Sequence, residues 1–163
     1  MVPISGEEKE YFFNHATHSD GTALWYGAKY GDSVPDKSSF FKDWQGYYFK
    51  DIENRKGRYF HIIQKGSKIG QINYNEIQSN EVDVDIIIYD KDNWSKGYGS
   101  SAIKLISAYL EEKYHVDKIW IDVHPHNTRA IKAYEKAGFN SKSKTKDELG
   151  IDYIRLSRKN RYK

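Results

Sequence analysis

Residues 58–89 alternate between polar and apolar types, and this period of two limits the possible folds more than any other feature of the chain. The alternation is interrupted at Lys65-Gly66 and again at Ser79-Asn80, which are residue types typical of tight turns. Short turns between alternating segments favour strands that pair with their neighbours in sequence. The pattern therefore predicts an antiparallel meander with strands over residues 58–63, 69–77 and 82–89.

The third of these strands separates its side chains by chemical type. Successive side chains of a strand point to opposite faces of the sheet. One face carries only apolar residues, whereas the other begins with three acids: Val82, Val84, Ile86 and Ile88 on the first, and Glu81, Asp83, Asp85, Ile87 and Tyr89 on the second. We expect the first face to join the core and the second to offer a functional site.

Segments whose apolar residues have helical spacing lie on both sides of the meander. Before it, the pattern predicts a helix over residues 7–16 and a second helix that begins near Asp36 and carries apolar residues as far as Tyr48. After it, we expect a helix from Gly97 to about residue 114, a strand over 117–123, a helix from Asn127 to Gly138, and final strands at about 139–146 and 151–157. A length of 163 residues and this order predict a single α+β domain over residues 1–163.

The composition of the chain limits the types of functional site and partner that it could have. The chain has no Cys, which excludes disulfides, thiolate metal sites and a cysteine nucleophile. Its longest apolar run, Ile86 to Tyr89, is far shorter than the roughly 20 residues needed to cross a bilayer, and the N-terminus lacks a secretory pattern. The net charge of +3 is too balanced to require a nucleic-acid partner. We therefore expect a cytoplasmic protein with neither a membrane nor a nucleic acid as its partner.

Glycines mark the start of the helix that follows the meander, in the segment from Trp94 to Ala102 (WSKGYGSSA). They allow successive backbone N–H groups to converge at the positive end of the helix dipole, a geometry that binds phosphate. A simple turn that opens a helix remains the alternative interpretation. A P-loop is excluded, because Lys96 precedes the glycine instead of following the second one.

The same segment also matches the dinucleotide fingerprint Gly97-x-Gly99-x-x-Ala102, with Asp122 twenty positions later. That fingerprint follows its strand directly, whereas Gly97 lies eight positions after Tyr89 and behind an antiparallel meander. The spacing therefore argues against a dinucleotide oxidoreductase.

Two stretches together resemble the signatures of the GNAT superfamily of acyl-CoA-dependent N-acetyltransferases. They are Trp94 to Gly99 (WSKGYG) and Asn127 to Phe139 (NTRAIKAYEKAGF). Within the superfamily the chain is most similar to aminoglycoside 6'-N-acetyltransferases and to ribosomal-protein N-terminal acetyltransferases. The resemblance is strong over residues 81–140 and implies a mixed, mostly antiparallel sheet flanked by helices. Trp94 occupies a position at which the family usually has Gln or Arg. Only residues 1–4 remain for the first strand of the family's fold, so we expect this strand to be short or missing.

The resemblance implies acetyl-CoA as the cosubstrate and no metal. Backbone amides of the helix start would cradle the CoA pyrophosphate, and the residues concerned are Lys96, Gly97, Tyr98, Gly99, Ser100 and Ser101. The strand at 85–89 would splay from the strand at 117–123, so that the pantetheine arm inserts between them. A backbone N–H near Ile87 or Ile88 would then serve as oxyanion donor. Asn127 would contact the CoA arm, cap its helix, or do both.

Two residues stand at the positions where the family places its catalytic groups. Tyr134 is expected to be the general acid, because a phenol with a pKa of about 10 stays protonated at neutral pH. Asp85 is expected to hold the substrate ammonium and take its proton. The alternatives are that Tyr134 only packs on its helix and that Asp85 is a solvated strand acid. Three acids at alternate positions favour the functional interpretation of Asp85, since they build a negative stripe suited to a cation.

Four further residues are candidates for acceptor binding. Asp83 belongs to the acidic stripe, and Asp122 matches a second acid that aminoglycoside-modifying relatives use, with a loop or capping role as the alternative. Trp25 and Tyr26 stand in a predicted loop and are expected to wall the acceptor cleft. The pair His124 and His126 lacks a third ligand at a standard spacing, so no metal site is expected there.

These observations together predict direct transfer of acetyl to a primary amine within a ternary complex, without an acyl-enzyme. Among the possible acceptors, we favour a small polycationic, aminoglycoside-like amine. The alternatives are a protein N-terminus or ribosomal protein, a polyamine or other metabolite, a non-catalytic acyl-CoA sensor, and an RNA-associated module that uses the basic tail from Arg155 to Lys163. The chain is expected to be a monomer or a homodimer.

Overall fold

The structure, a computed structural model, describes residues 1–26, 33–43, 46–50, 54–146 and 150–160. Outside these ranges lie residues 147–149 between the last two predicted strands, residues 44–45 of the second predicted helix, and the end of the basic tail at residues 161–163.

Seven strands form one mixed sheet in the order β1-β2-β3-β4-β5-β7-β6. Their bounds are Val2–Pro3 for β1, Arg58–Gln64 for β2, Ser67–Tyr74 for β3, Glu81–Ile88 for β4, Lys118–Val123 for β5, Ser141–Lys146 for β6 and Asp152–Lys159 for β7. Among these neighbours only β4 and β5 run parallel. The sheet thus consists of an antiparallel meander and an antiparallel C-terminal group, joined by one parallel pair.

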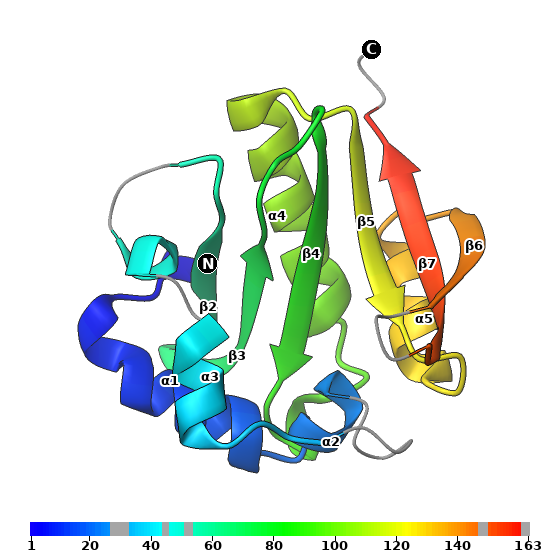
Figure 1. Ribbon diagram of the computed structural model, residues 1–163. Helices are drawn as coiled ribbons and strands as arrows, with labels where there is room; N and C mark the ends of the chain where they lie inside the picture. The colour runs from blue at the N-terminus through cyan, green and yellow to red at the C-terminus, as the bar shows by residue number, and fades with distance from the viewer. Residues whose placement is uncertain (27–32, 44–45, 51–53, 147–149, 161–163) are drawn as a thin grey trace.

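Helices cover both faces of this sheet (Figure 1). The helices α4 and α5 lie on one face, and α1, α2 and α3 on the other. Their bounds are Lys9–His18 for α1, Thr22–Trp25 for α2, Lys37–Asp43 for α3, Tyr98–Tyr114 for α4 and Thr128–Lys136 for α5, with short 3-10 turns η1 at Gly6–Glu8, η3 at Gly46–Phe49 and η4 at Lys91–Asn93. The arrangement confirms the α+β class expected from the order of the elements.

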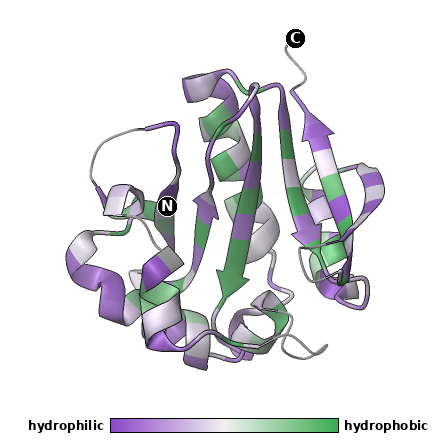
Figure 2. Ribbon diagram, viewed as in Figure 1, coloured by the Kyte–Doolittle hydropathy of each residue, from purple (hydrophilic) through white to green (hydrophobic). Residues whose placement is uncertain are grey.

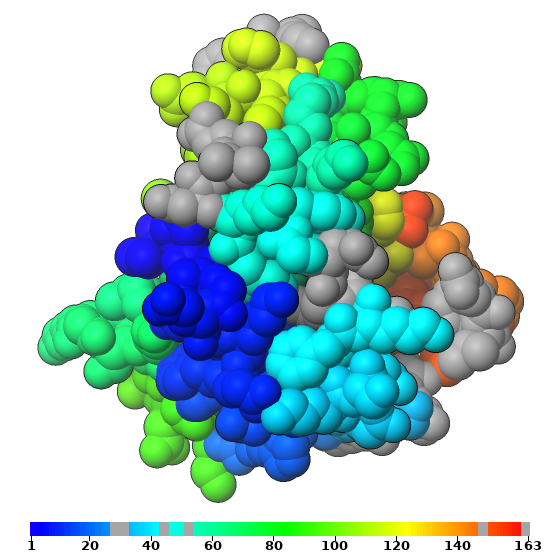
Figure 3. Space-filling view, turned by 60° about the vertical axis from the view of Figure 1, so that its left-hand side comes forward, coloured from blue at the N-terminus to red at the C-terminus, as the bar shows by residue number. Residues whose placement is uncertain are grey.

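Each face of the sheet has its own apolar core. The larger core packs α4 and α5 against β3, β4 and β5, and includes the fully buried Ile72, Ile103 and Leu110. The smaller core is aromatic and lies under the N-terminal helices; its rings include Phe12, Phe13, Phe40, Phe49 and Tyr59. In Figure 3 the blue α1 and the cyan α3 lie side by side over this aromatic core. The N-terminal third of the chain therefore closes one face of the sheet.

The structure confirms the predicted meander, but the end of its second strand and the helix before it differ from the prediction. The second strand ends at Tyr74, although alternation continues to Ile77. The helix expected to run from Asp36 to Tyr48 is broken into α3 and η3, with Gly46 at the start of the second piece. Asp36 does cap α3, since its carboxylate accepts from the Ser39 N–H at 2.8 Å. The first strand is short, as expected: its two residues pair with β2.

Candidate active site

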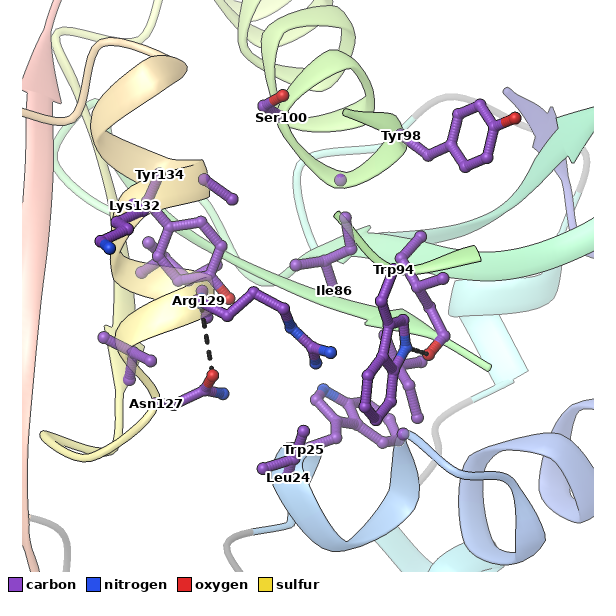
Figure 4. Close-up of a pocket in the computed structure, with 18 of the residues that line it drawn as sticks. Leu24, Trp25, Ile86, Trp94, Tyr98, Ser100, Asn127, Arg129, Lys132 and Tyr134 are labelled. Atoms are coloured by element: carbon purple, nitrogen blue, oxygen red, sulfur yellow. Dashed lines mark hydrogen bonds between the residues drawn. The ribbon is translucent and has the colours of Figure 1, made fainter. Parts of the chain in front are cut away.

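A cavity of about 290 Å³ opens between β4 and β5. The parts of the chain that line it include α2, the C-terminal half of β4, the segment 93–100, the end of β5, α5, and Tyr153 of β7. Figure 4 shows side chains from α2, α4 and α5 converging on this space. The cavity lies where the expected cofactor and acceptor residues come together.

The cavity exists because β4 and β5 diverge. Their parallel ladder has only three register pairs, which begin at Glu81–Lys118 and end at Asp83–Trp120. Both strands continue beyond that point, and β5 pairs with β7 along its whole length as far as Val123. The splay that the family resemblance implies is therefore present in the backbone.

Backbone direction along β4 distinguishes the two expected oxyanion donors. The Tyr89 N–H donates to the Ile69 carbonyl of β3 at 3.0 Å. Since the backbone groups of alternate residues in a strand point to the same side, the N–H of Ile87 also faces β3, whereas that of Ile88 faces the diverging β5. The Ile88 carbonyl, on that open side, accepts from the Trp94 indole at 3.0 Å. Of the two candidates, Ile88 has the N–H that is turned to the cavity.

The start of α4 forms the phosphate-type site. Gly97 precedes the helix with a φ of 85°, a conformation that favours glycine, and a Cβ there would meet nothing within 4 Å. The first N–H groups of an α-helix have no partner within the helix, so those of Tyr98, Gly99 and Ser100 are available to an anion. Figure 4 shows Tyr98 and Ser100 at this end of α4. The backbone therefore fits a pyrophosphate at the position expected from the glycines.

Two of the residues expected at this phosphate site differ from the others in their surroundings. The Ser101 N–H already donates to the Gly97 carbonyl at 3.0 Å, so it is not a free donor for a ligand. Lys96 is exposed and does not line the cavity. The cradle therefore begins at Gly97 and ends at Ser100.

Trp94 and Arg129 join the two sides of the cavity, a role that the sequence did not indicate. The guanidinium carbon of Arg129 lies 3.5 Å from the centroid of the Trp94 ring, within the range of a cation–π contact. Figure 4 shows Arg129 extending from α5 toward Trp94 and Trp25. Arg129 is part of the second signature stretch, but spacing alone cannot show which way its side chain extends.

Asp85 is half-buried in the wall of the cavity, near the point where the strands separate. Burial, followed by the charges of Asp83 and Asp122, raises its pKa to about 7. The side-chain amides of Asn73 and Asn75 act in the opposite direction, because hydrogen bonds to the carboxylate stabilise it. A carboxyl group with a pKa near neutrality can both accept and release a proton under ordinary conditions.

The remaining acids of the expected negative stripe are already engaged. Lys118 Nζ lies 3.0 Å from the Glu81 carboxylate. Asp83 accepts a hydrogen bond from the Asn75 amide, and burial raises its pKa. Asp83 lines a second hollow on the surface, near Trp120 and Arg155, and does not line the main cavity. The acceptor side is thus less negative than the sequence pattern indicates.

Asp122 lines the cavity, but its carboxylate is paired with Arg155. The contacts are 2.9 Å from Nε to Oδ1 and 2.7 Å from Nη2 to Oδ2, and the guanidinium also stacks on Trp120 at 3.6 Å. Because both oxygens face the guanidinium, Asp122 is not a free anchor for an acceptor ammonium. The structure places Asp122 within β5, and therefore not in the loop that was considered as the alternative.

Tyr134 is buried on α5 and lines the cavity. Burial, then the charge of Asp85, raises the pKa of its phenol, although Arg129 acts in the opposite direction. The hydroxyl therefore stays protonated at neutral pH and can donate a proton. Asn127 begins the same helix: its Oδ1 accepts from the Ala130 N–H at 3.3 Å, which is the capping role predicted from the sequence (Figure 4). Its amide nitrogen remains available to a ligand at the cavity wall.

Trp25 was expected in a loop, but it is the last residue of α2 and lines the cavity. Tyr26 follows the helix as its C-cap residue and does not line the cavity, and both rings pack against the aromatic core. Gly21 explains why α2 lies so close to β4: a Cβ at this position would lie 2.5 Å from the Ile88 carbonyl oxygen. Only Trp25 keeps the geometry expected of an acceptor-cleft residue.

Within the described ranges, no cluster of three His, Asp or Glu side chains has the arrangement of a metal site. The rings of His124 and His126 lie 5.4 Å apart, and His124 faces the cavity. In the same part of the chain, no helix is both long and apolar enough to cross a membrane.

Known proteins share this fold. The family description "Acetyltransferase (GNAT) domain" matches residues 2–140. Aminoglycoside acetyltransferase AAC(6')-Ib in complex with coenzyme A and kanamycin is 16% identical, with a TM-score of 0.77 over 97% of this chain and 92% of that one. Spermidine N-acetyltransferase from Vibrio cholerae with CoA and spermine is 19% identical, with a TM-score of 0.74 over 96% and 92%. The GNAT domain of S. lividans PAT is 16% identical, with a TM-score of 0.68 over 97% and 88%.

A splayed parallel pair of strands with a glycine-rich helix start beside it defines an acyl-CoA-dependent transferase. Because the family description covers most of the chain, the protein belongs to the GNAT family of acetyltransferases, and acetyl-CoA is its cosubstrate. The open cradle before α4 and the gap beyond Asp83 fit the pyrophosphate and the pantetheine arm of that cosubstrate.

Proposed function

We propose that the protein transfers acetyl directly to a primary amine of a small polycationic acceptor, with Asp85 as base and Tyr134 as general acid. The observation that carries this proposal is the position of the two groups in one cavity. Asp85 on β4 and Tyr134 on α5 both line this cavity, and the charge of Asp85 affects the Tyr134 phenol. A base and an acid in one cavity suit a reaction in which one proton is removed and another is supplied.

Each part of the site has one task in this proposal. The N–H groups from Gly97 to Ser100 bind the cosubstrate phosphates, and the Ile88 N–H is a donor for the thioester oxygen. Asp85 binds the acceptor ammonium and takes its proton, which leaves the amine neutral and nucleophilic. Tyr134 supplies a proton to the departing thiolate, which leaves as the thiol of CoA. Acetyl-CoA supplies the activated acetyl group, so no covalent attachment to the chain is needed.

Charge supports a cationic acceptor. Asp85 lines the cavity, whereas Glu81 and Asp122 are paired with Lys118 and Arg155. A carboxyl group in the wall of the transfer site favours a cationic acceptor. The fold neighbours described above include proteins in complex with kanamycin and with spermine, both of which are polyamines.

A panel of amines tests the proposal, with thiol release from acetyl-CoA as the assay. The panel holds an aminoglycoside, a linear polyamine, a peptide with a free N-terminus, and an uncharged amine. We expect the highest kcat/KM for a polycation, and a decrease in kcat/KM as salt screens the acidic face. A peptide as the best substrate would instead favour N-terminal acetylation, and CoA binding without turnover on any amine would indicate a sensor.

A further inference from the structure

The Ile88 carbonyl at the end of β4 is bound by a side chain instead of a neighbouring strand. Its oxygen accepts from the indole Nε1 of Trp94 at 3.0 Å, six positions later in the chain (Figure 4). The ladder with β5 has already ended, because its last register pair is Asp83–Trp120. The indole N–H therefore takes the place of a strand partner at the open edge of β4.

The segment between β4 and α4 turns Trp94 back toward the strand. The 3-10 turn η4 precedes Trp94, and the backbone N–H of Trp94 donates to the Lys91 carbonyl at 3.0 Å. Ser95, the next residue, has a φ of 59°, in the left-handed region that residues other than glycine rarely adopt. Such conformations persist only where the surrounding structure fixes them. The backbone on both sides of Trp94 thus specifies where the indole lies.

Other contacts hold the rest of this strand end. The Tyr89 N–H donates to the Ile69 carbonyl at 3.0 Å, and the Gly21 N–H donates to the Tyr89 carbonyl at 2.9 Å. The start of α2 also confines the Ile88 oxygen, since a Cβ on Gly21 would lie 2.5 Å from it. The bond from Trp94 completes this set on the side of the gap. The Ile88 N–H is the group that remains turned to the cavity.

The ring of Trp94 is in turn held by α5. The Arg129 guanidinium carbon lies 3.5 Å from the ring centroid, and Arg129 belongs to the helix that carries Tyr134. This contact favours one orientation of the ring, the one in which the indole N–H points to β4. Trp94 therefore connects the strand of the proposed oxyanion donor to the helix of the proposed acid.

We propose that Trp94 is a positioning residue for acetyl transfer, whose indole N–H fixes the Ile88 carbonyl and thereby aims the Ile88 N–H at the thioester oxygen. The carbonyl and the N–H of one residue are linked through its α-carbon, so a displacement of the first also displaces the second. A donor stabilises the transition state only when it is held where the charge develops. The inference rests on the proposed function, because it requires the Ile88 N–H to be the oxyanion donor.

Infrared difference spectra of bound acetyl-CoA, labelled with ¹³C at the acetyl carbonyl, test this role. A hydrogen bond polarises a carbonyl group and lowers its stretching frequency, so binding to the wild type should move the band to lower frequency. Trp94→Phe keeps a ring for Arg129 but has no N–H, and it should lose most of that shift. Its kcat should fall by about 10-fold, while CoA affinity measured by calorimetry changes little.

A second variant removes the N–H alone. Replacement of Trp94 by 3-benzothienylalanine puts sulfur in place of the indole nitrogen in a ring of the same shape, so it serves if phenylalanine disturbs folding. The same loss of the band shift and of kcat is expected.

Trp120→Phe is the matched control. Trp120 also stacks on an arginine, Arg155, at 3.6 Å, but it lines the second hollow. Its carbonyl band and kcat should equal those of the wild type. A band that stays at the wild-type frequency in both Trp94 variants would overturn the positioning role, whatever their kcat. If the wild type itself shows no shift, the Ile88 N–H is not the oxyanion donor, so the two failures are distinguishable.

Discussion

The guanidinium group of Arg155 faces both carboxylate oxygens of Asp122, at 2.9 Å and 2.7 Å. This two-point ion pair connects β7 to β5 at the edge of the cavity. The acid that the sequence analysis proposes as an acceptor-binding residue is therefore already paired with Arg155. Asp122 then acts on the reaction through its charge, as one of the groups that raise the pKa of Asp85.

Asp122→Asn should therefore change the pH dependence of kcat/KM more than the KM for the acceptor. Removing this negative charge lowers the pKa of Asp85, so the acid limb of kcat/KM should move to lower pH, while KM for the acceptor changes little. The measurement is a set of initial rates between about pH 5 and 9. A large rise in KM with an unmoved limb would show that Asp122 holds the acceptor after all.

Asp85→Asn and Asp83→Asn should separate proton transfer from capture. Asp85 must be ionised to accept a proton, so wild-type kcat/KM should fall as the pH drops below about 7, the pKa of this group. Asp85→Asn should lower kcat strongly and remove that limb. Asp83→Asn should mainly raise KM, and less so at high salt, where charges are screened. If Asp85→Asn keeps its kcat, a peptide N-terminus becomes the better acceptor hypothesis.

Tyr134→Phe should lower kcat by about 10-fold or more, with little change in acetyl-CoA affinity. The reason is that the phenol keeps its proton at neutral pH and can supply it to the departing thiolate. Tyr109→Phe is the control, since the Tyr109 hydroxyl faces Tyr114 at 3.5 Å and lies outside the cavity. Full turnover in Tyr134→Phe would mean that water protonates the thiol.

Gly97→Glu should abolish acetyl-CoA binding in a calorimetric titration. The new carboxylate would enter the space before α4, and its charge would repel the phosphates. Gly66→Glu is a close control, because Gly66 also has a positive φ, 81°, and open space around it, but lies in the turn between β2 and β3. The control shares the backbone strain and should bind normally. Equal CoA affinity in both variants would refute the phosphate cradle.

Sequence reasoning found the elements of the fold because their signals are local. The alternation of polar and apolar residues predicted the meander, and Gly97 and Asn127 indicated the starts of α4 and α5. In Figure 2 the mixed colours along the first half of β4 and the hydrophobic end at residues 86–88 reproduce the pattern on which the site prediction was based.

The rest of the site depends on partners that are distant in sequence. Nothing near Asp122 in the chain reveals that Arg155 will neutralise it, because β7 comes beside β5 only in the folded sheet. The helical position of Trp25 was missed because a helix of four residues leaves almost no periodic signal.

The short ladder between β4 and β5 joins the two antiparallel parts of the sheet along a narrow seam. Val82 and Ile119 are register partners in this seam, and both are almost completely buried in the larger core. The gap that fits the pantetheine arm therefore opens just beyond a pair of side chains that are anchored in the apolar interior.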